Sequence, residues 1–442
     1  MKLLKRLVPW LLLVLLILVA YFNYPKLTII SGYASKNMAS AVFITHRTPK
    51  SVTDSDNSIP LINLTEVESE PTMAMATIFG LMERKTICRE GLGCVLINDS
   101  YNPKSHIPTP HRELISNELP FPYGNNGTKD TVFDNVDYAL LQKTVDSLFS
   151  TESQKTRTVL VAYKNQIVAE RYAEGFTKET PMLGWSMTKS VLGTLYGILA
   201  HQEKLDLDSP APIASWQNDE RKHITLNHLL RMQSGLEWDE DYTKISDVTR
   251  MLFLNSDMTT VQQEKKAIGS PTEIWNYSSG TTNLLSGILR KHFNTHQEYL
   301  DFPYTALIDK IGMNSMIIEA DTKGNFVGSS YGWANTRDWA KFGILYLNKG
   351  YWNGEQLFSP DWVDYIKQPT VNSNGTYGAH FWLNAGGKYP DVPRDLYSAN
   401  GFQGQRVFII PSKDLVVVRT GISDGSVFDV NTFLKGIIAS IR

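Results

Sequence analysis

The chain has 442 residues, of which 42% are hydrophobic, 20% charged and 11% aromatic, a composition typical of a folded globular protein rather than a disordered one. Lysine plus arginine total 43 and aspartate plus glutamate total 45, so the formal charge of −2 gives no electrostatic basis for nucleic-acid binding. Two cysteines exclude a disulfide scaffold, an iron–sulfur protein and a thiolate-rich zinc protein.

Residues 1–24 predict a membrane-spanning anchor. An uninterrupted apolar run of 16 residues, from Leu7 to Phe22, follows three cations within the first six positions. The run is slightly shorter than the roughly 20 residues of a comfortable span, and no small-x-small cleavage site follows it, so we favour an uncleaved anchor over a cleaved signal sequence. The positive-inside bias then keeps the N-terminus in the cytoplasm. We therefore expect a single-pass protein of the cell inner membrane, with the rest of the chain facing the periplasm or the outside.

Cys88 and Cys94 fit this exported location. They flank five residues in the sequence Cys-Arg-Glu-Gly-Leu-Gly-Cys. An oxidising compartment permits a disulfide that closes this small loop, whereas the alternative is two unpaired thiols in a core. On the compartment argument, we expect a bridge.

Residues 25–135 are expected to form an accessory region and linker. Short strands are predicted at 42–44 and 94–97, where apolar residues run together. The stretch from 98 to 129 is rich in proline, asparagine and glycine, which is typical of a loop.

Residues 136–442 form the predicted main domain. Periodicity predicts, in chain order, a helix from Asp137, a hairpin over 158–173, a helix over 186–200, a mostly helical block over about 204–350, strands at 377–382, 406–410 and 415–418, and a closing helix over 432–441. Residues 411–414, Pro-Ser-Lys-Asp, are typical of a turn between the last two strands.

These elements indicate an α/β fold of the α+β kind. Two strands come early and three late, and the short connections within each group favour an antiparallel sheet. The economical architecture is one sheet built from both chain ends, flanked by helices, with the helical block inserted as a second lobe. A cleft between two lobes is a usual place for a small-molecule site.

Several motifs were considered and set aside. The sequence contains no phosphate-binding Gly-x-x-x-x-Gly-Lys-Ser/Thr loop and no His-Glu-x-x-His, so we expect neither a metal nor a cofactor. His292 and His296 are four residues apart and are interpreted as surface helix residues. Residues 421–425 match Gly-x-Ser-x-Gly, but no histidine follows them to complete a hydrolase triad, so we interpret them as a turn.

Ser186-Met187-Thr188-Lys189 is the single Ser-x-x-Lys in the chain, and it opens a predicted helix. Residues three apart on a helix share a face, with Cβ atoms about 5–6 Å apart, so the lysine amine can reach the serine oxygen. The helix N-terminus favours negative charge near Ser186. Desolvation in a closed pocket would leave part of Lys189 neutral and able to accept the serine proton. The alternative interpretation is a helix-capping serine and an unrelated surface lysine.

Two later segments supply groups of the kind such a pair needs. Tyr277, in the sequence Asn-Tyr-Ser-Ser-Gly, lies between helical segments and could relay protons above the serine. Gly401-Phe402-Gln403-Gly404 enters a late strand and could offer backbone N–H groups to an oxyanion. Taken singly, each segment is equally typical of an aromatic packing loop or a β-turn.

In combination, these segments resemble the serine hydrolase family of class C β-lactamases, penicillin-binding proteins and related esterases and amidases. Ser-x-x-Lys at 186–189, Tyr-x-Asn and a Lys/His-x-Gly strand form the family pattern, and a hydrophobic-Ser-Gly signature at 234–235 also matches. The resemblance covers about 140–442. Within the family, the chain is most similar to membrane-anchored relatives of aminohexanoate-dimer hydrolase, including the stretch from Arg89 to Cys94.

The resemblance implies a β-lactamase-like fold and roles for particular residues. Ser186 would be the nucleophile, Lys189 and Tyr277 the general base and acid, and the N–H groups of Ser186 and Phe402 the oxyanion hole. Gly401, Ser279 and Asn400 would also contact the substrate. Two positions depart from the pattern: Ser279 replaces the asparagine of the second element, and Ala399 replaces the cation of the third. That cation helps to hold a carboxylate, so its absence weakens the case for an efficient β-lactamase or D-Ala-D-Ala peptidase.

We therefore expect an extracytoplasmic serine hydrolase that cleaves a small-molecule ester or amide through an acyl-enzyme on Ser186. One alternative is a β-lactamase or D-Ala peptidase acting on cell-wall peptides. Another is a catalytically silent binding module on the same fold.

Overall fold

The computed structural model describes residues 2–98, 100–115, 119–124, 127–129, 131–423 and 427–442. The chain divides into two compact units. Unit 1 comprises Met1–Arg89, Cys94–Pro103 and Asp241–Ser256, and unit 2 comprises Glu90–Gly93, Lys104–Glu240 and Asp257–Arg442. The described residues between 104 and 135 fall within unit 2 by this division.

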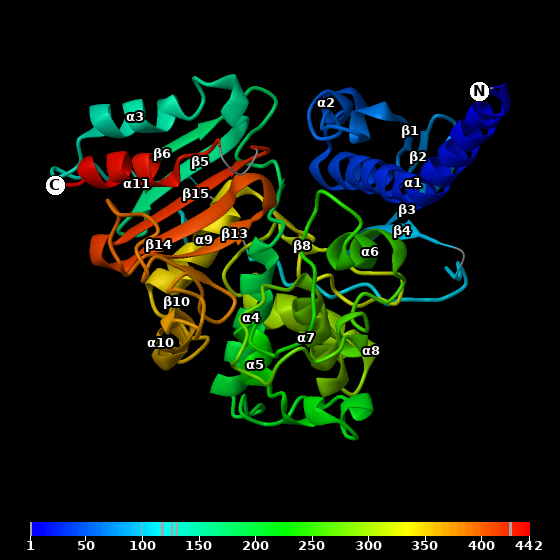
Figure 1. The fold of residues 1–442 in the computed structure, drawn as a ribbon. Coiled ribbons are helices and arrows are strands. Elements are labelled where there is room, and N and C mark those ends of the chain that lie inside the picture. Colours follow the sequence, from blue (N-terminus) through cyan, green and yellow to red (C-terminus); the bar gives the residue numbers. More distant parts are fainter. Residues whose placement is uncertain (1, 99, 116–118, 125–126, 130, 424–426) are drawn as a thin grey trace. The chain divides into compact units, whose positions relative to one another are not determined.

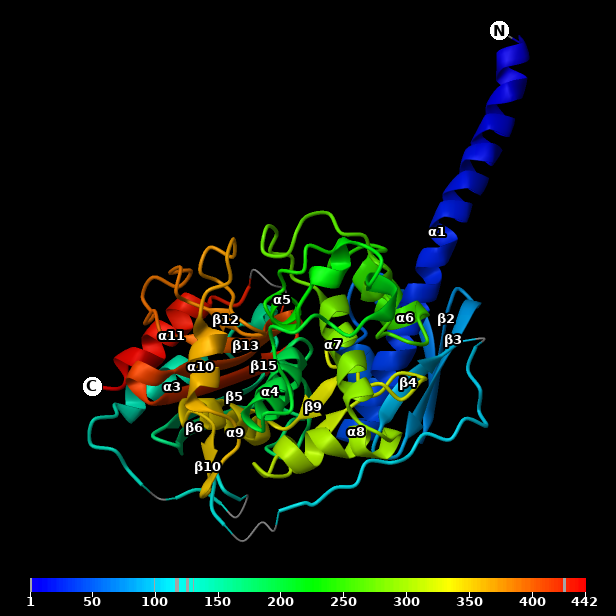
Figure 2. The ribbon, with the colours of Figure 1, turned by 90° about the horizontal axis from the view of Figure 1, so that it is seen from below.

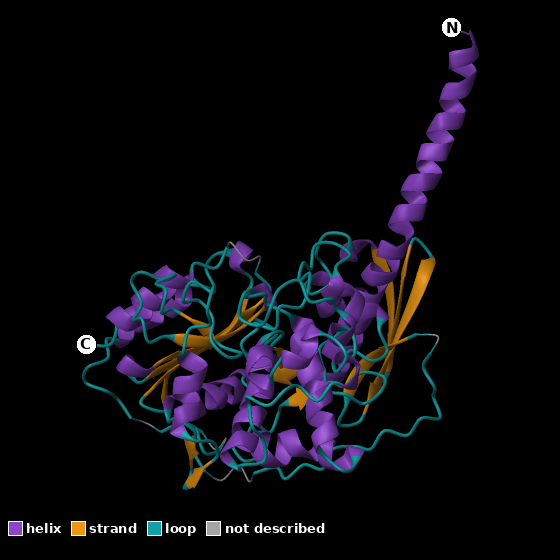
Figure 3. Cartoon of the chain, turned by 60° about the horizontal axis from the view of Figure 1, so that its bottom comes forward, coloured by secondary structure: helices purple, strands orange, loops and turns teal. Residues whose placement is uncertain are grey.

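Unit 1 is built on one long helix and one sheet. Helix α1 (Lys2–Thr45) is uninterrupted (Figure 3). The four-stranded sheet has the order β1-β2-β3-β4 and consists of β1 (Thr65–Glu70), β2 (Met73–Ile78), β3 (Leu81–Arg89) and β4 (Gly93–Ile97). Two short helices, α2 (Pro49–Asp54) and α6 (Asp247–Leu254), pack with α1.

The second half of α1 packs against this sheet. Ala34, Met38 and Ala41 are buried, and Ser35 donates a hydrogen bond to the carbonyl of Ala74 on β2. The strand predicted at 42–44 is wrong, because these residues continue α1. The helix buries one face against the sheet, and this tertiary contact overrides the local β propensity of Val-Phe-Ile. The strand predicted at 94–97 is present as β4.

Cys88 and Cys94 are joined by a disulfide with an S–S distance of 2.06 Å. The bridge links the end of β3 to the start of β4. Leu92, inside the closed loop, is buried in the core of unit 2, and its carbonyl accepts a hydrogen bond from the N–H of Ala320.

Unit 2 contains an antiparallel six-stranded sheet of order β12-β13-β14-β15-β5-β6. The late strands β12 (Trp382–Leu383), β13 (Tyr397–Gly401), β14 (Gln405–Ile410) and β15 (Leu415–Gly421) continue into the early strands β5 (Thr156–Tyr163) and β6 (Gln166–Tyr172). This topology confirms a sheet built from both chain ends. Residues 377–381, predicted as strand, are mostly bends; Tyr377 makes an isolated bridge with Trp382, and His380 adopts a left-handed backbone with φ of 58°.

Helices cover both faces of this sheet (Figure 1). On one face, α3 (Tyr138–Ser147) and α11 (Val430–Ala439) cover side chains such as Phe408 and Val417. On the other face, α4 (Met187–His201) and α9 (Thr336–Leu347) pack on side chains such as Val407 and Val416. Helix α9 falls at the end of the predicted helical lobe, yet its Gly343 lies directly against Val407 and Val416 of the sheet.

The remaining elements of unit 2 form the inserted, mostly helical part and two small sheets. They are β7 (Met182–Leu183), α5 (Leu226–Leu230), α7 (Ser279–His292), α8 (His296–Pro303), β8 (Ile317–Ile318), β9 (Gly332–Ala334), β10 (Tyr351–Trp352), β11 (Glu355–Gln356) and α10 (Pro360–Lys367). Strands β7, β9 and β8 form a three-stranded antiparallel sheet. Its edge strand β7 leads directly into the start of α4.

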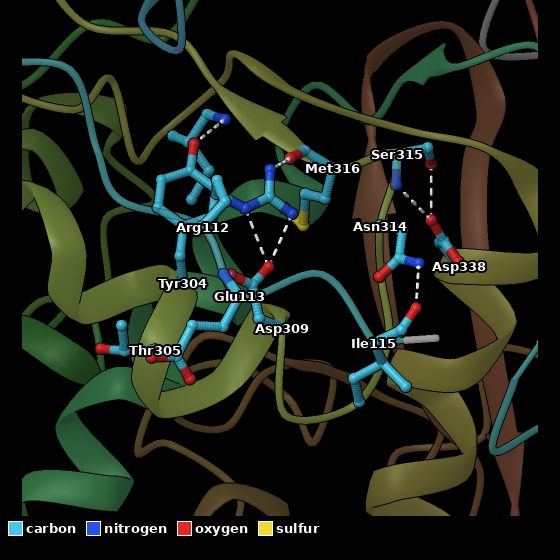
Figure 4. Close-up of polar contacts among 12 residues, drawn as sticks. Arg112, Glu113, Ile115, Tyr304, Thr305, Asp309, Asn314, Ser315, Met316 and Asp338 are labelled. Carbon is cyan, nitrogen blue, oxygen red and sulfur yellow. Dashed lines mark hydrogen bonds and ion pairs between the residues drawn. The ribbon is translucent and has the colours of Figure 1, made fainter. Parts of the chain in front are cut away.

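The irregular segment after residue 104 is fastened to unit 2 by ion pairs and hydrogen bonds (Figure 4). Arg112 donates to a carboxylate oxygen of Asp309 at 2.8 Å and to the carbonyl of Met316 at 2.9 Å. The N–H of Glu113 donates to the other oxygen of Asp309 at 2.7 Å, and Asn314 donates to the carbonyl of Ile115. These contacts satisfy backbone groups that a loop without secondary structure would otherwise leave unpaired.

Candidate active site

The predicted nucleophile, Ser186, is the N-cap residue of α4. The residue before it, Trp185, has a left-handed backbone with φ of 47°, which a bulky residue adopts only under strain. Gly184 makes this turn possible, because a Cβ at that position would lie 2.4 Å from the Trp339 ring. The turn holds Ser186 at the positive end of the helix dipole, where developing negative charge is stabilised.

Lys189 lies one turn further along α4 and is 1% exposed. Its Nζ lies 2.9 Å from Ser186 Oγ, 2.9 Å from Ser279 Oγ and 2.9 Å from the carbonyl oxygen of Ser329. Burial lowers the pKa of Lys189 to about 8, while the nearby carboxylate of Glu240 acts in the opposite direction. A lysine in this setting is partly neutral near physiological pH and can accept a proton.

Ser279 connects the lysine to a carboxylate that the sequence analysis missed. Ser279 Oγ donates to Glu240, and the N–H of Ser279 donates to the other oxygen of Glu240 at 2.8 Å. The indole N–H of Trp238 donates to that same oxygen at 2.5 Å. Glu240 lies five residues after the Ser-Gly signature at 234–235. An acidic residue this close to that signature was the sequence feature that could have identified Glu240 as part of the site.

Tyr277 lies close to the amine of Lys189. Lys189 Nζ is 4.9 Å from the centroid of the Tyr277 ring. Burial raises the pKa of the phenol, whereas its hydrogen bonds with Ser186 and Trp382 lower it. The ring packs against Trp382 at 5.2 Å and Tyr377 at 5.7 Å between centroids. This packing fixes the phenol beside the Ser186 hydroxyl.

The end of β13 lies beside the turn that carries Ser186. A Cβ at Gly401 would lie 2.0 Å from the carbonyl oxygen of Gly184, so the two backbones touch. The ring of Phe402, which is 38% exposed, meets the Trp185 ring edge-on at 5.6 Å. The buried Arg419 donates to the carbonyls of Gln403 and Gly404, which holds the loop after Phe402 in place.

Asn400 lies on β13 beside Arg406 of β14. Side chains alternate along a strand, and Tyr397 and Ala399 point into the core that contains α4. Asn400 therefore points to the opposite face, where it is paired across strands with Arg406. Its carboxamide oxygen is buried without a hydrogen-bond partner.

The motifs that were set aside have structural partners. Ser423 is 1% exposed, accepts a hydrogen bond from Arg419 and donates one to the carbonyl of Gln154, so it is no exposed nucleophile. The rest of that Gly-x-Ser-x-Gly match, at 424–425, lies outside the described residues. The Nε2 atom of His296 lies 3.0 Å from the carbonyl oxygen of Gly324, within hydrogen-bond distance. Among the described residues, no group of three or more His, Cys, Asp or Glu side chains is arranged to hold a metal ion.

A family model described as Beta-lactamase matches residues 145–429, well over half of the chain, and spans every residue of the arrangement above. The chain belongs to the β-lactamase family. This family is part of the serine hydrolase superfamily, and a 6-aminohexanoate-dimer hydrolase is a named relative of the chain.

Named relatives of this β-lactamase-family chain illustrate that range. The 6-aminohexanoate-dimer hydrolase of Paenarthrobacter ureafaciens is 21% identical over 334 residues, which are 65% of this chain and 80% of that protein. A Bacillus anthracis structure with a provisional assignment to the same activity is 22% identical, with a TM-score of 0.57 over 70% of this chain and 85% of that one. A family VIII carboxylesterase is 15% identical, with a TM-score of 0.53 over 71% of this chain and 98% of that one. These structural likenesses establish the fold.

Proposed function

We propose that this protein is a membrane-anchored, extracytoplasmic serine hydrolase that cleaves an ester or amide through an acyl-enzyme on Ser186. One observation carries the proposal: the buried amine of Lys189 lies 2.9 Å from Ser186 Oγ. Activation of a serine hydroxyl needs a base within hydrogen-bond reach whose pKa lies well below that of a free lysine, and burial lowers the pKa of Lys189 to about 8.

The reaction follows from the positions of the groups. Ser186 Oγ attacks the carbonyl carbon while its proton passes to Lys189 Nζ. The negative charge on the carbonyl oxygen is held by the N–H groups of Ser186 and Phe402, which belong to segments whose backbones touch at Gly184 and Gly401. Tyr277 donates its proton to the leaving alcohol or amine and takes up the proton held by Lys189. A water molecule then hydrolyses the acyl-enzyme by the same proton path in reverse.

The substrate class follows from the departures at 399 and 279. Ala399 is fully buried and carries no charge, so the usual cation of the third element is missing. This favours a neutral acyl ester or amide over a β-lactam or a D-Ala peptide. Nitrocefin and a D-Ala-D-Ala peptide should accordingly be poor substrates beside short aryl esters and the aminohexanoate dimer.

The anchor is proposed from the first part of α1. The helix passes the length and hydropathy criteria for a membrane span, with a mean hydropathy of 1.9, and its apolar window is unburied. Side chains from Trp10 to Val19 are 46–67% exposed, as expected for a surface that meets lipid.

Labelling with a fluorophosphonate tests the function independently of the natural substrate. Wild-type protein should gain one adduct, located on Ser186 by peptide mass spectrometry, and Ser186→Ala should gain none. Equal labelling of the two proteins, or no labelling of the wild type above pH 8 where Lys189 is largely neutral, would reject the proposal.

A further inference from the structure

We propose that Glu240 is a positioning residue that fixes the direction of the Lys189 lone pair through the hydroxyl of Ser279. This inference rests on the proposed function and concerns a residue that the family pattern does not include. It accounts for the replacement of the usual asparagine by Ser279, because a hydroxyl, unlike an amide, can donate and accept at one atom.

The hydrogen bonds that join Glu240, Ser279 and Lys189 each have a fixed direction. Glu240 is a carboxylate and accepts only, and it already accepts from the N–H of Ser279 and the indole of Trp238. The hydroxyl proton of Ser279 therefore points to Glu240, and Ser279 Oγ can only accept from Lys189.

The neighbours of Lys189 account for all of its N–H groups. A neutral amine has two N–H groups and one lone pair. The carbonyl of Ser329 is an acceptor, and Ser279 Oγ is made one by Glu240, so these two take both N–H groups. The lone pair is then left for Ser186 Oγ, the third neighbour at 2.9 Å. Without Glu240, Ser279 could turn its proton toward Lys189 and compete with Ser186.

The charges that face Lys189 define the test. Glu240 favours the protonated amine, and the Tyr277 ring lies near it. The pKa of His380 is lowered mainly by burial and further by the charge of Lys189. Replacing Glu240 by an uncharged residue should therefore make the Lys189 amine easier to deprotonate. The same change should leave the lone pair of that amine less often directed at Ser186 Oγ.

The experiment measures the rate of fluorophosphonate labelling of Ser186 against pH. Glu240→Gln should lower the plateau rate by about tenfold or more, since a well-placed general base contributes about 100- to 10,000-fold. The acid limb, which is the pH range in which the labelling rate falls as Lys189 becomes protonated, should move to lower pH. Glu240→Asp, which keeps the charge, should keep the limb of the wild type, and the exposed Glu237→Gln should change neither limb nor plateau.

Two outcomes would overturn the proposal. One is an unshifted acid limb in a folded Glu240→Gln protein, which would reduce Glu240 to a packing role. The other is full additivity of Glu240→Gln and Ser279→Ala, because residues that act through one hydroxyl must be non-additive. If wild-type protein is not labelled at all, the proposed function fails instead, so the two failures are distinguishable.

From an independent observation in unit 1, we infer that the β2–β3 hairpin tip and the loop before β1 form a second contact with the lipid surface beside the anchor. Four apolar side chains are strongly exposed there: Leu61 at 58%, Leu64 at 46%, Phe79 at 67% and Leu81 at 50%. They meet at one end of the sheet, since Thr65, which starts β1, pairs with Ile78, which ends β2.

Three contacts show which way this end points. Ser31 of α1 donates to the carbonyl of Met82 at 2.6 Å, Ser35 donates to Thr86 at 2.8 Å, and Cys88 approaches the carbonyl of Ala39. Strand β3 therefore runs alongside α1 in the same direction, and its start extends toward the apolar half of the helix (Figure 2).

The distances match the headgroup layer. Thr28, whose hydroxyl contacts Met82, lies six residues beyond Phe22, where the apolar run ends, or about 9 Å along the helix axis. Phe79 lies three residues before Met82, so the hairpin tip extends back from this level toward Phe22. Each interfacial layer of a bilayer is about 5–7 Å thick, so the hairpin tip lies within it when the apolar run spans the core. Phe79 also adopts a left-handed φ of 54° in the two-residue turn, where Asn or Asp is usual. An exposed phenylalanine in this backbone conformation costs conformational free energy.

A polarity-sensitive fluorophore on Phe79→Cys tests this contact in the full chain, in phosphatidylethanolamine–phosphatidylglycerol vesicles that carry nitroxide-labelled lipid. A probe on Glu68→Cys, exposed in the middle of β1, is the matched control. Quenching at 79 should be at least double that at 68. Equal quenching would overturn the inference, as would a blue shift at 79 without quenching, which indicates burial against a protein partner. Co-flotation of wild-type protein with the vesicles tests the anchor separately.

Discussion

The backbones of Gly401 and Gly184 touch, and this contact joins the end of β13 to the turn before Ser186. Any Cβ at 401 would lie 2.0 Å from the carbonyl oxygen of Gly184. The separation of the two proposed oxyanion donors, on Ser186 and Phe402, is therefore set by a position that tolerates only glycine.

Gly401→Ala should lower kcat for an aryl ester by about 100- to 1,000-fold, the usual cost of one lost oxyanion donor, with little change in KM. The added methyl must push β13 away from the turn and carry Phe402 with it. Steady-state kinetics check the effect. Gly175→Ala, at a surface turn with open space around it, is the control and should retain activity; an active Gly401→Ala protein would contradict the proposed donor.

Lys189→Arg should abolish labelling of Ser186 across the accessible pH range. Arginine keeps the positive charge but stays protonated, so it cannot take the serine proton. In the wild type, the labelling rate should rise with pH and level off above about 8, since burial lowers the pKa of Lys189 to about 8 and the neutral amine is the active form. A rate that is flat from pH 6 to 9 would contradict Lys189 as the base.

His380 should make the protein sensitive to mild acid. Burial lowers its pKa to about 4 from the ordinary 6.5, so the unfolded chain binds this proton more tightly than the folded chain. The free energy of unfolding should fall as pH falls from about 6.5 to 4, by up to about 3 kcal/mol at 1.36 kcal/mol per pKa unit.

Urea titrations at several pH values check this dependence against His380→Asn, which tolerates the left-handed backbone at this position. The variant should show a flatter dependence over the same range. An equally steep loss in His380→Asn would assign the acid sensitivity to other groups.

Arg419→Met should destabilise the protein and impair catalysis together. The buried guanidinium donates to the carbonyls of Gln154, Gln403 and Gly404, so its removal leaves buried acceptors unpaired at about 1–3 kcal/mol each. Thermal unfolding and ester hydrolysis measure the two effects. The partly exposed cation Lys413, two residues before the same strand, provides the control Lys413→Met, which should change neither.

The sequence predicted the parts of the fold that depend on near neighbours. Helix α4, the β5–β6 hairpin and strands β14 and β15 followed from periodicity, because residues two or three to four apart share a face of a strand or helix. The proximity of Ser186 and Lys189 is the same kind of local fact. The predictions at 42–44 and 377–381 failed where packing on a sheet, or a left-handed His380, overrode local propensity.

The sequence could not predict the contacts between residues that are far apart in the chain. Ser279 and Ser329 lie 90 and 140 residues from Lys189, and Glu240 joins them from a third segment. No periodic pattern encodes such a meeting, since it depends on how α4, α7 and the segment before β9 pack around one core. The amino-acid sequence placed a serine and a lysine on one helical turn; the tertiary structure buried the amine, surrounded it with acceptors and so decided which way its lone pair points.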